Sequence, residues 1–478
     1  MATIEGLQSE HPADLLLVNT PLIDYVDRLR AYSAEDLLPP LGLGYIATEA
    51  ATRGHNVGLI DAEAQGVSVQ ELADVINKTR PRYVGINALT PTVTVLDSIV
   101  KHIDPDIPII LGGAHPTALP IDMVHRYSYD GRQIIGIRGE GETVVGDILD
   151  GSKLSRLPAT YWMDDKDVVR HNPFGPERAT AYADLDSVPR LDRKYLINDP
   201  AIDAHTGLKE ARMLATRGCP FTCKFCSGAR DALGLPLRKR DNGDVIEEIN
   251  DLVMGEGVQS IRLIDDLFMR SEPQVADFLD VLDEQGMDIQ FDVTSRVNIM
   301  NKFSEQLWAR LGQRIHEVSV GIEHGVKRVR DTAEKGILDE HIYNTLDRGC
   351  PKGIRFKLYG ILGLPEATTE EEYQNVRFFQ DLVKRHPGQI RASLFRFRPY
   401  PGTKYWDELL AQGWTKEEML EMSGDETRVD DKRARHSVLT ARSFGGPSVN
   451  ELTNMLLGFN EWQTQQLADR SELAAGPW

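Results

Sequence analysis

The sequence predicts an α/β protein with a doubly wound N-terminal domain, a partial parallel (β/α)6 barrel after it, and a mostly helical C-terminal region. Two series of short apolar runs, separated by stretches with helical spacing, predict the two sheets. From Tyr405 onward the pattern becomes helical, acidic and polar. The expected divisions are a first domain at 1–150, an appendage and linker at 151–210, the barrel at 211–404 and the helical region at 405–478.

In the first 150 residues, short runs rich in Val, Ile and Leu each precede a turn that contains Pro, Gly, Asn or Asp. Near-continuous hydrophobicity is typical of strands that are buried on both faces of a parallel sheet. Segments 40–53 and 69–79 between the runs have helical spacing. The pattern predicts a Rossmann-like domain whose ligand lies outside the carboxyl ends of the strands. The expected strands are Asp14–Val18, Asn56–Ile60, Tyr83–Asn87, Ile107–Leu111 and Ile134–Arg138.

A second series of apolar runs follows the polar segment 151–210 and alternates with helix-forming stretches. This order predicts a partial parallel barrel with its chemistry at the carboxyl ends of the strands. The expected strands are Ala211–Ala215, Ser260–Ile264, Ile289–Val293, Glu317–Gly321, Arg355–Leu362 and Ala392–Phe397.

The composition is that of an ordinary globular protein, with 41% hydrophobic and 27% charged residues. The formal charge of -19 comes from 54 basic and 73 acidic side chains. This balance argues against nucleic acids and anionic membranes as partners, because both are polyanions. The sequence shows no signal peptide and no apolar run long enough to span a membrane, so we expect a cytoplasmic protein.

Three of the four cysteines lie in one loop with the spacing Cys219-x3-Cys223-x2-Cys226. Thiolates are soft ligands that suit zinc or an iron–sulfur cluster. A structural zinc site needs a fourth ligand, and neither the distant Cys350 nor His205 has the usual paired spacing. Three thiolates can instead bind three irons of a cubane cluster and leave the fourth iron open. We therefore expect a 4Fe–4S cluster at this loop.

The cysteine loop and the strand ends after it resemble the radical S-adenosylmethionine (SAM) superfamily. An aromatic residue precedes the last cysteine, and an Asp-Asp turn, an Arg and a Glu then follow in the family's order. The resemblance implies that the aromatic ring packs on adenine, the acidic turn binds the methionine amino group, and the guanidinium holds the methionine carboxylate. The Glu is implied to bind the ribose hydroxyls or the amine. The implied SAM contacts are Phe225, Asp265, Asp266, Ser295, Arg296 and Glu323.

The N-terminal domain resembles the cobalamin-binding domain that precedes some radical enzymes. The matching segments lie at strand ends, where small residues and backbone N–H groups can closely approach a large ligand. A domain without a cofactor, or one adapted to another ligand, is the alternative. The implied cobalamin contacts are Thr20, Pro21, Leu89, Thr90, Pro91, Thr92, Gly112, Gly113, His115, Gly139 and Glu140.

The sequence lacks the Asp-x-His-x-x-Gly motif that supplies an axial histidine to cobalt. His115 lies in a Gly-Gly-Ala-His-Pro-Thr turn, where we expect it to bond locally or to contact the cobalamin tail. Cobalt is therefore expected to have no histidine ligand, and the loop at 89–91 is the candidate to cover its lower face.

The combined resemblance implies a cobalamin-dependent radical SAM methyltransferase. The resemblance also implies that one SAM molecule would methylate reduced cobalamin, and that a second would be cleaved to a 5′-deoxyadenosyl radical with an electron from an external donor such as flavodoxin or ferredoxin. The expected substrate is a biosynthetic small molecule that is methylated on an unactivated carbon or a phosphinate phosphorus. One alternative keeps both cofactors but catalyses ring formation, rearrangement or oxidation. Another is a cobalamin-binding sensor with a structural metal, which the Asp, Arg and Glu set disfavours because such a metal needs no methionine clamp.

Overall fold

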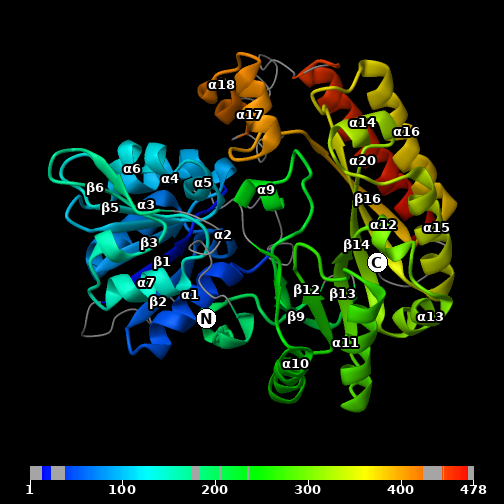
Figure 1. Ribbon diagram of the computed structural model, residues 1–478, viewed down its shortest axis with the longest axis horizontal. Helices are drawn as coiled ribbons and strands as arrows, with labels where there is room; N and C mark the ends of the chain where they lie inside the picture. Colours follow the sequence, from blue (N-terminus) through cyan, green and yellow to red (C-terminus); the bar gives the residue numbers. More distant parts are fainter. Residues whose placement is uncertain are drawn as a thin grey trace. The chain divides into compact units, whose positions relative to one another are not determined.

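The computed structural model describes residues 13–22, 38–173, 184–203, 206–233, 236–423, 444 and 446–471. The chain forms two compact units, and each contains a seven-stranded sheet (Figure 1). The first unit consists of Met1–Asp199, Ser227–Arg238 and Pro399–Thr427. The second consists of Pro200–Cys226, Lys239–Arg398 and Arg428–Trp478.

The sheet of the first unit has the strand order β2-β1-β3-β4-β5-β6-β7, and its first five strands are parallel. All five strands predicted for this domain are present. The two antiparallel strands come from the segment expected to be an appendage and linker, and they extend the same sheet. The strands are β1 Leu15–Asn19, β2 Val57–Asp61, β3 Tyr83–Asn87, β4 Ile109–Gly112, β5 Ile134–Ile137, β6 Thr160–Met163 and β7 Val169–His171.

Both faces of this sheet are buried, as the continuous apolar strands predict. Leu16 and Val18 of β1 belong to one apolar cluster, and Leu15 and Leu17 belong to another. Helices α3 (Val69–Thr79), α4 (Val93–His102) and α6 (Pro120–Tyr127) supply the first cluster, whereas α1 (Leu41–Thr52) and α7 (Glu142–Leu149) supply the second. The result is the expected doubly wound, three-layered arrangement (Figure 1).

The strand order reverses between β1 and β3, because the chain adds β2 on one side of β1 and β3 on the other. The last residues of these strands are in register, with Asn19 beside both Asp61 and Asn87. Ligands of doubly wound sheets bind at this kind of switch point.

The sheet of the second unit has the order β16-β15-β14-β13-β12-β9-β8, with six parallel strands and the antiparallel β8 at one edge. All six strands predicted for the barrel are present. Because β16 and β8 are both edge strands, the sheet is an open half-barrel. The strands are β8 Ala201–Ile202, β9 Lys209–Met213, β12 Ser260–Leu263, β13 Gln290–Ser295, β14 Ile315–Glu323, β15 Arg355–Leu362 and β16 Ile390–Arg396.

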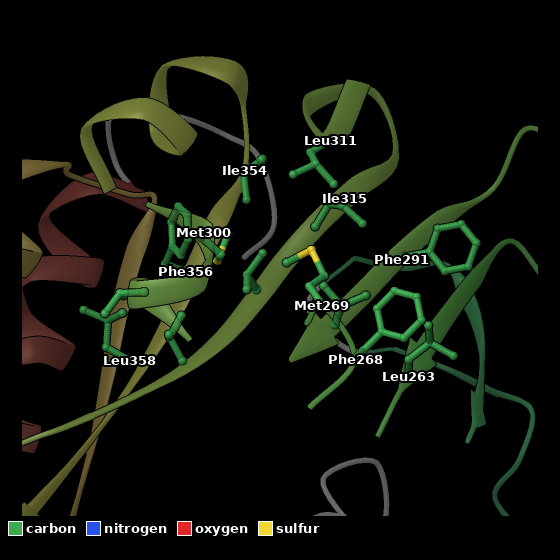
Figure 2. Packing of buried hydrophobic residues seen from close by; sticks show 14 of the residues in the cluster. Leu263, Phe268, Met269, Phe291, Met300, Leu311, Ile315, Ile354, Phe356 and Leu358 are labelled. Atoms are coloured by element: carbon green, nitrogen blue, oxygen red, sulfur yellow. The ribbon is translucent and has the colours of Figure 1, made fainter. Parts of the chain in front are cut away.

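The two faces of this second sheet differ in character. In β15, Phe356 and Leu358 are buried in an apolar cluster, part of which Figure 2 shows, whereas Arg355, Lys357 and Tyr359 alternate with them on the other face. We call this second side the polar face of the half-barrel. The helices that pack on the apolar side are α10 Asn242–Glu256, α11 Glu272–Glu284, α13 Glu305–Arg314, α15 Asp339–Gly349, α16 Thr369–Arg385 and α20 Val449–Ser471.

The helical region expected at 405–478 is divided between the two units. Helices α17 (Lys404–Ala411) and α18 (Lys416–Ser423) belong to the first unit, and α20 belongs to the second. The Gln463 amide of α20 bonds both the backbone N–H (2.8 Å) and the C=O (2.9 Å) of Ala392, so it satisfies part of the edge strand β16. Of the helices described, none is long and apolar enough to cross a membrane.

Candidate functional site

The cysteine loop leaves the half-barrel after β9 and the short strand β10 (Thr216–Arg217). Cys223 is buried and Cys219 and Cys226 are half-buried, and the Cys226 N–H donates to the Cys223 carbonyl at 3.1 Å. Burial raises the pKa of the Cys219 thiol. In the described part of the chain, no three His, Cys, Asp or Glu side chains could hold a single metal ion. The donor set of three thiols on one loop fits a 4Fe–4S cluster, in which each thiolate binds a separate iron.

The turn after α14 (Lys327–Thr332) packs against this loop. The Lys224 N–H donates to the Ala333 carbonyl at 3.1 Å, and the Thr222 hydroxyl donates to Glu334 Oε2 at 3.2 Å. Lys335 then places its ammonium 5.9 Å from the centre of the Phe225 ring. This turn contains no recognisable ligand motif, so the sequence alone did not connect it with the cysteine loop.

Arg296 lies at the end of β13 and is also directed at the cysteine loop. Its Nη1 lies 3.3 Å from Cys223 Sγ, its Nη2 donates to the Lys335 carbonyl, and its guanidinium carbon lies 3.7 Å from the centre of the Phe221 ring. The side chain of Ser295 faces elsewhere, because its hydroxyl donates to the Met269 carbonyl at 3.0 Å. Ser295 therefore fixes the end of the strand from which Arg296 projects.

Glu323, the last residue of β14, forms a buried ion pair with Lys335, with Oε1 and Nζ 2.7 Å apart. Its backbone is left-handed, with φ of 70°, and the register with β15 shifts between Gly321 and Glu323. A Cβ on Gly321 would overlap Glu323 Oε1 and lie 2.7 Å from Lys335 Nζ, so the pair needs glycine at this position. Lys335 thus contacts Glu323, Phe225 and Arg296, three residues that the sequence assigned to SAM.

A fully buried polar network holds the ends of β14 and β15 together. Asn375 accepts from the Gly325 N–H at 2.7 Å and donates to the Ile361 carbonyl at 2.9 Å. Glu372 accepts from the Gly363 N–H at 2.7 Å and lies 3.3 Å from Asn375 Nδ2. Both side chains come from α16, so this helix fixes the strand end that carries Glu323.

The two residues of the predicted acidic turn lie in different environments. Asp265 is buried, and its Oδ1 accepts from the Ala215 N–H (2.9 Å) and the Thr216 N–H (3.1 Å) at the entry to the cysteine loop. Burial raises the pKa of Asp265 to about 7. Asp266 is exposed. Asp266 also has a backbone hydrogen bond with Gly218, so both carboxylates support the cysteine loop and Asp266 is the more exposed of the two.

In the first unit, an asparagine network joins the carboxyl ends of the strands at the switch point. Asn87 Nδ2 donates to Asn19 Oδ1 at 2.9 Å, and Asn19 Nδ2 donates to Asp61 Oδ1 at 2.8 Å. Thr20 is bonded to Asn87 twice, through its N–H to Oδ1 (2.9 Å) and through its hydroxyl to the backbone carbonyl (2.6 Å). The sequence pointed to the segment 19–21, with Thr20 and Pro21 as ligand contacts, but missed the support from Asp61 and Asn87.

The loops after β3 and β4 touch each other closely. Gly113 has φ of 100°, and a Cβ there would lie 2.7 Å from the Ala88 carbonyl oxygen. The same carbonyl accepts from the His115 N–H at 3.1 Å, and the Ala88 N–H donates to the Gly112 carbonyl at 2.8 Å. Glycine is therefore required at 113 for the two loops to meet.

His115 is buried, and its Nδ1 lies 3.0 Å from the hydroxyl of Thr90, which is also buried. Burial lowers the pKa of His115 to about 4, so the ring is neutral at neutral pH. Thr92 accepts from the Leu89 N–H at 3.1 Å and so closes the turn that also contains Pro91. Leu89 itself is 44% exposed.

The last predicted segment of this domain follows β5. The Gly139 N–H donates to the Thr117 hydroxyl at 3.1 Å, which brings the loops after β4 and β5 together. Glu140 forms a two-point ion pair with Arg238, with one contact of 3.1 Å. The structure therefore gathers the segments at 19–21, 88–92, 112–117 and 139–140 along one edge of the first sheet.

Comparison with known sequences identifies a B12 binding domain at residues 28–149. An uncharacterized methyltransferase from Pyrococcus horikoshii is 28% identical over 393 residues, which cover 79% of this chain and 81% of the relative. An anaerobic magnesium-protoporphyrin IX monomethyl ester cyclase from Rubrivivax gelatinosus is 23% identical over 78% of this chain and 66% of the cyclase. A cytidylyl-2-hydroxyethylphosphonate methyltransferase from Streptomyces wedmorensis is 22% identical over 79% of each chain.

Two solved structures share the fold. The cobalamin-dependent SAM radical enzyme OxsB with aqua-cobalamin bound has a TM-score of 0.62 at 15% identity, over 85% of this chain and 62% of OxsB. The radical SAM methyltransferase TsrM from Kitasatospora setae, with cobalamin and a [4Fe-4S] cluster bound, has a TM-score of 0.62 at 18% identity, over 83% of this chain and 78% of TsrM. This chain spans less than two thirds of the OxsB chain.

These findings confirm the predicted fold class and the resemblance stated from the motifs. The curated relatives include methyltransferases, and the structural neighbours bind cobalamin, SAM or an iron–sulfur cluster. The chain therefore joins a B12-binding domain to the fold of the cobalamin-dependent radical SAM enzymes.

Proposed function

We propose that this protein is a cobalamin-dependent radical SAM methyltransferase that methylates an unactivated carbon, or a phosphinate phosphorus, of a small molecule. One observation carries the proposal: the cysteine loop, Arg296 and Glu323 are linked through Lys335 within one unit, in a chain that also has a B12-binding domain. A zinc-containing sensor would have no use for this buried Arg, Lys and Glu set.

Cys219, Cys223 and Cys226 hold the cluster in this proposal. When bound, the cluster supplies the electron that cleaves SAM to a 5′-deoxyadenosyl radical, and cobalamin supplies the methyl group. Arg296 places positive charge beside the Cys223 sulfur. Arg296 also offers a planar fork of donors that matches the methionine carboxylate.

Glu323 and Phe225 complete the proposed SAM contacts. The Glu323 carboxylate is fixed by Lys335 and by the close approach of Gly321, so it is oriented before SAM binds. The Phe225 ring lies beside the same ammonium and offers a face to adenine. Because Arg296, Glu323 and Lys335 are buried, they act in a medium that strengthens their electrostatic contacts.

In the first unit, the loops after β1, β3, β4 and β5 are the proposed cobalamin contacts. Gly112, Gly113 and Gly139 expose backbone where a side chain would obstruct a large ligand. His115 is buried, its Nδ1 is bonded to Thr90, and it lies outside any Asp-x-His-x-x-Gly motif, so we assign it to the tail or to its own loop rather than to cobalt. The exposed Leu89 would give bound cobalamin an apolar contact from the loop at 89–91.

A second candidate function keeps the same cofactors but joins or oxidises substrate carbons without methyl transfer. The observation that favours it is the similarity to magnesium-protoporphyrin IX monomethyl ester cyclases. The donor of the required electron in either case is proposed to be a flavodoxin or ferredoxin.

Anaerobic turnover of the reconstituted full chain, with deuteromethyl SAM, cobalamin, a low-potential reductant and candidate substrates, tests the proposal by mass spectrometry. We expect 5′-deoxyadenosine and S-adenosylhomocysteine together, and a product in which a deuterated methyl group replaces hydrogen. Formation of 5′-deoxyadenosine without S-adenosylhomocysteine, with a product that has only lost hydrogen, would instead establish the second candidate. Cys223→Ala serves as the inactive control, and Cys350→Ala should retain iron because Cys350 is buried away from the loop among apolar residues.

A further inference from the structure

The polar face of the half-barrel carries ion pairs between neighbouring strands and also across an intervening strand. Arg262 of β12 lies 2.9 Å from Asp292 of β13, and Arg391 of β16 makes a two-point pair with Glu317 of β14 at 2.7 and 2.8 Å. Arg262 also lies 3.2 Å from Glu210 of β9. These pairs satisfy the charges that the strands direct away from the helices.

Arg355, at the start of β15, contacts His316 rather than a carboxylate. Lys357 also has no carboxylate partner in the described part of the chain. It is half-buried in the middle of β15, where Ser319 and Arg391 are its register neighbours on the two adjoining strands. Among the residues that the structure describes, no carboxylate lies within ion-pair distance of its ammonium, and Glu317 pairs with Arg391 instead. Its one recorded contact is with the ring of Tyr359, 5.2 Å from Nζ to the ring centre. A partly buried cation with no anion beside it is complementary to an anionic ligand.

Two aromatic rings extend the polar face from Lys357 toward Glu323. Tyr359 lies two residues after Lys357 on the same face, and it is in register with Gly321. Phe395 of β16 lies 6.0 Å from Tyr359 between ring centres, with the two ring planes tilted by 32°. Phe395 is 47% exposed, whereas Phe356 on the apolar face is fully buried. The exposed Phe395 ring, next to the ring of Tyr359, offers a stacking surface to a flat molecule.

We propose that Lys357, Tyr359 and Phe395 form the substrate subsite, and that the substrate is a planar conjugated molecule with an anionic oxygen group. Lys357 pairs with the anionic group, and the two rings hold the plane of the conjugated part. Tyr359 precedes Gly360, the register partner of Glu323, so this inference rests on the proposed function, in which Glu323 binds SAM. The anionic group is a carboxylate or a phosphoryl group, since an ammonium attracts both.

Naphthalene-2-carboxylate, naphthalene-2-carboxamide, a naphthyl phosphonate and cyclohexanecarboxylate are suitable probes, with binding to the anaerobically reconstituted full chain measured by equilibrium dialysis. We expect the naphthyl anions to bind about tenfold more tightly than the amide and than the non-aromatic carboxylate, a difference of about 1.4 kcal/mol. The stronger of the carboxylate and the phosphonate identifies the anionic group of the substrate.

Two variants separate the charge from the rings. Lys357→Met should weaken the binding of the naphthyl anions about tenfold and leave the binding of the amide unchanged. Phe395→Ala should weaken the binding of anion and amide alike. Lys384→Met is the matched control, because Lys384 has a similar cation–π contact, 5.5 Å from the Trp462 ring centre, but lies on the helical side. The control should bind every probe as the unmodified chain does. Lys357→Arg retains the charge and should therefore bind the anions as the unmodified chain does. It keeps the test valid if Lys357→Met is poorly folded.

Equal binding of carboxylate and amide by the unmodified chain, or unchanged anion binding in Lys357→Met, would overturn this subsite. Iron content, cobalamin content and SAM binding are measured on the same samples. A chain that lacks those cofactors but still discriminates anion from amide through Lys357 would contradict the proposed function and leave the subsite standing. A chain that binds iron, cobalamin and SAM but does not discriminate anion from amide would contradict the subsite and leave the proposed function standing.

Discussion

Lys335 joins three parts of the second unit that are far apart in the sequence. Its ammonium pairs with Glu323 and lies over Phe225, while its carbonyl accepts from Arg296. A lone lysine in a Glu-Lys-Gly turn has no distinctive spacing, so the sequence offered no reason to single it out. Its significance comes from the partners that the fold brings to it.

Arg296→Ala should weaken SAM binding by about 3 kcal/mol, the scale of a lost buried, charge-assisted pair. Iron content should survive, because the three thiolates remain. Equilibrium binding of SAM to the reconstituted protein measures the loss, and Arg296→Lys should recover only part of it because an ammonium lacks the planar fork. Unchanged affinity in Arg296→Ala and Asp266→Ala together would remove both residues from the site.

Lys335→Met leaves the Glu323 carboxylate buried without its cation and should lower the free energy of unfolding by about 3 kcal/mol. The double variant Lys335→Met with Glu323→Gln should recover most of that stability, because no charge is then left unpaired. Urea unfolding measures the cycle. SAM binding should remain weak in the double variant. Full stability in Lys335→Met alone would show that the pair is not a buried ion pair in solution.

His115 should make the first unit sensitive to acid. Its pKa is lowered to about 4 by burial, so below the ordinary value of 6.5 the unfolded chain binds a proton that the folded chain does not. Stability is therefore complete above pH 6.5 and falls as the pH drops toward 4, by up to about 1.4 kcal/mol per pH unit. In His115→Gln this part of the pH dependence should vanish in urea unfolding curves. The exposed His102 is the control, since His102→Gln should leave the pH profile as it is.

At the scale of elements, helix α16 determines where strands β14 and β15 end. Its Glu372 and Asn375 bond backbone groups beyond both strands, and the left-handed Glu323 lies just before one of these contacts. The capping box of Thr368 and Glu371 fixes the start of this helix, and hence the height at which its polar residues meet the strands.

Glu372→Gln should destabilise the protein by about 1–3 kcal/mol, because the new amide turns a donor toward the amide donor of Asn375. SAM binding should weaken as well, since Glu323 loses a support. Thermal unfolding and SAM titration are the measurements. Glu370→Gln on the exposed side of the same helix affects only surface contacts with Arg377 and Gln374 and should change stability by less than about 1 kcal/mol. Equal effects of the two substitutions on stability would show that the Glu372–Asn375 network does not stabilise the strand ends.

At the scale of the whole molecule, the proposed cluster and cobalamin sites belong to different units. Cobalamin is expected to bind with its dimethylbenzimidazole tail displaced and with no protein imidazole on cobalt. Paramagnetic resonance of the cobalt(II) state should therefore show axial lines without nitrogen triplets, in the unmodified chain and in His115→Ala alike. Triplets that disappear in His115→Ala would make that histidine the ligand. Cys223→Ala should abolish iron binding and leave this cobalt spectrum unchanged.

The sequence by itself determined the fold class and the order of the motifs. The bounds of each parallel strand in both sheets were predicted to within a few residues, because a buried strand has a short run of apolar side chains. The cysteine loop was equally local, since all its ligands lie between residues 219 and 226. Information of this kind needs no knowledge of distant contacts.

Only the tertiary structure decided what depends on pairing across the chain. The ion pair of Glu323 and Lys335, the bonding of Thr20 to Asn87 and the attachment of β6 and β7 to the first sheet each join separate segments. The alternation of Arg355, Lys357 and Tyr359 with apolar residues was visible in the sequence, but which side the helices cover was not. Such pairings follow from strand order and packing, which bring together residues whose separation along the chain leaves no local pattern.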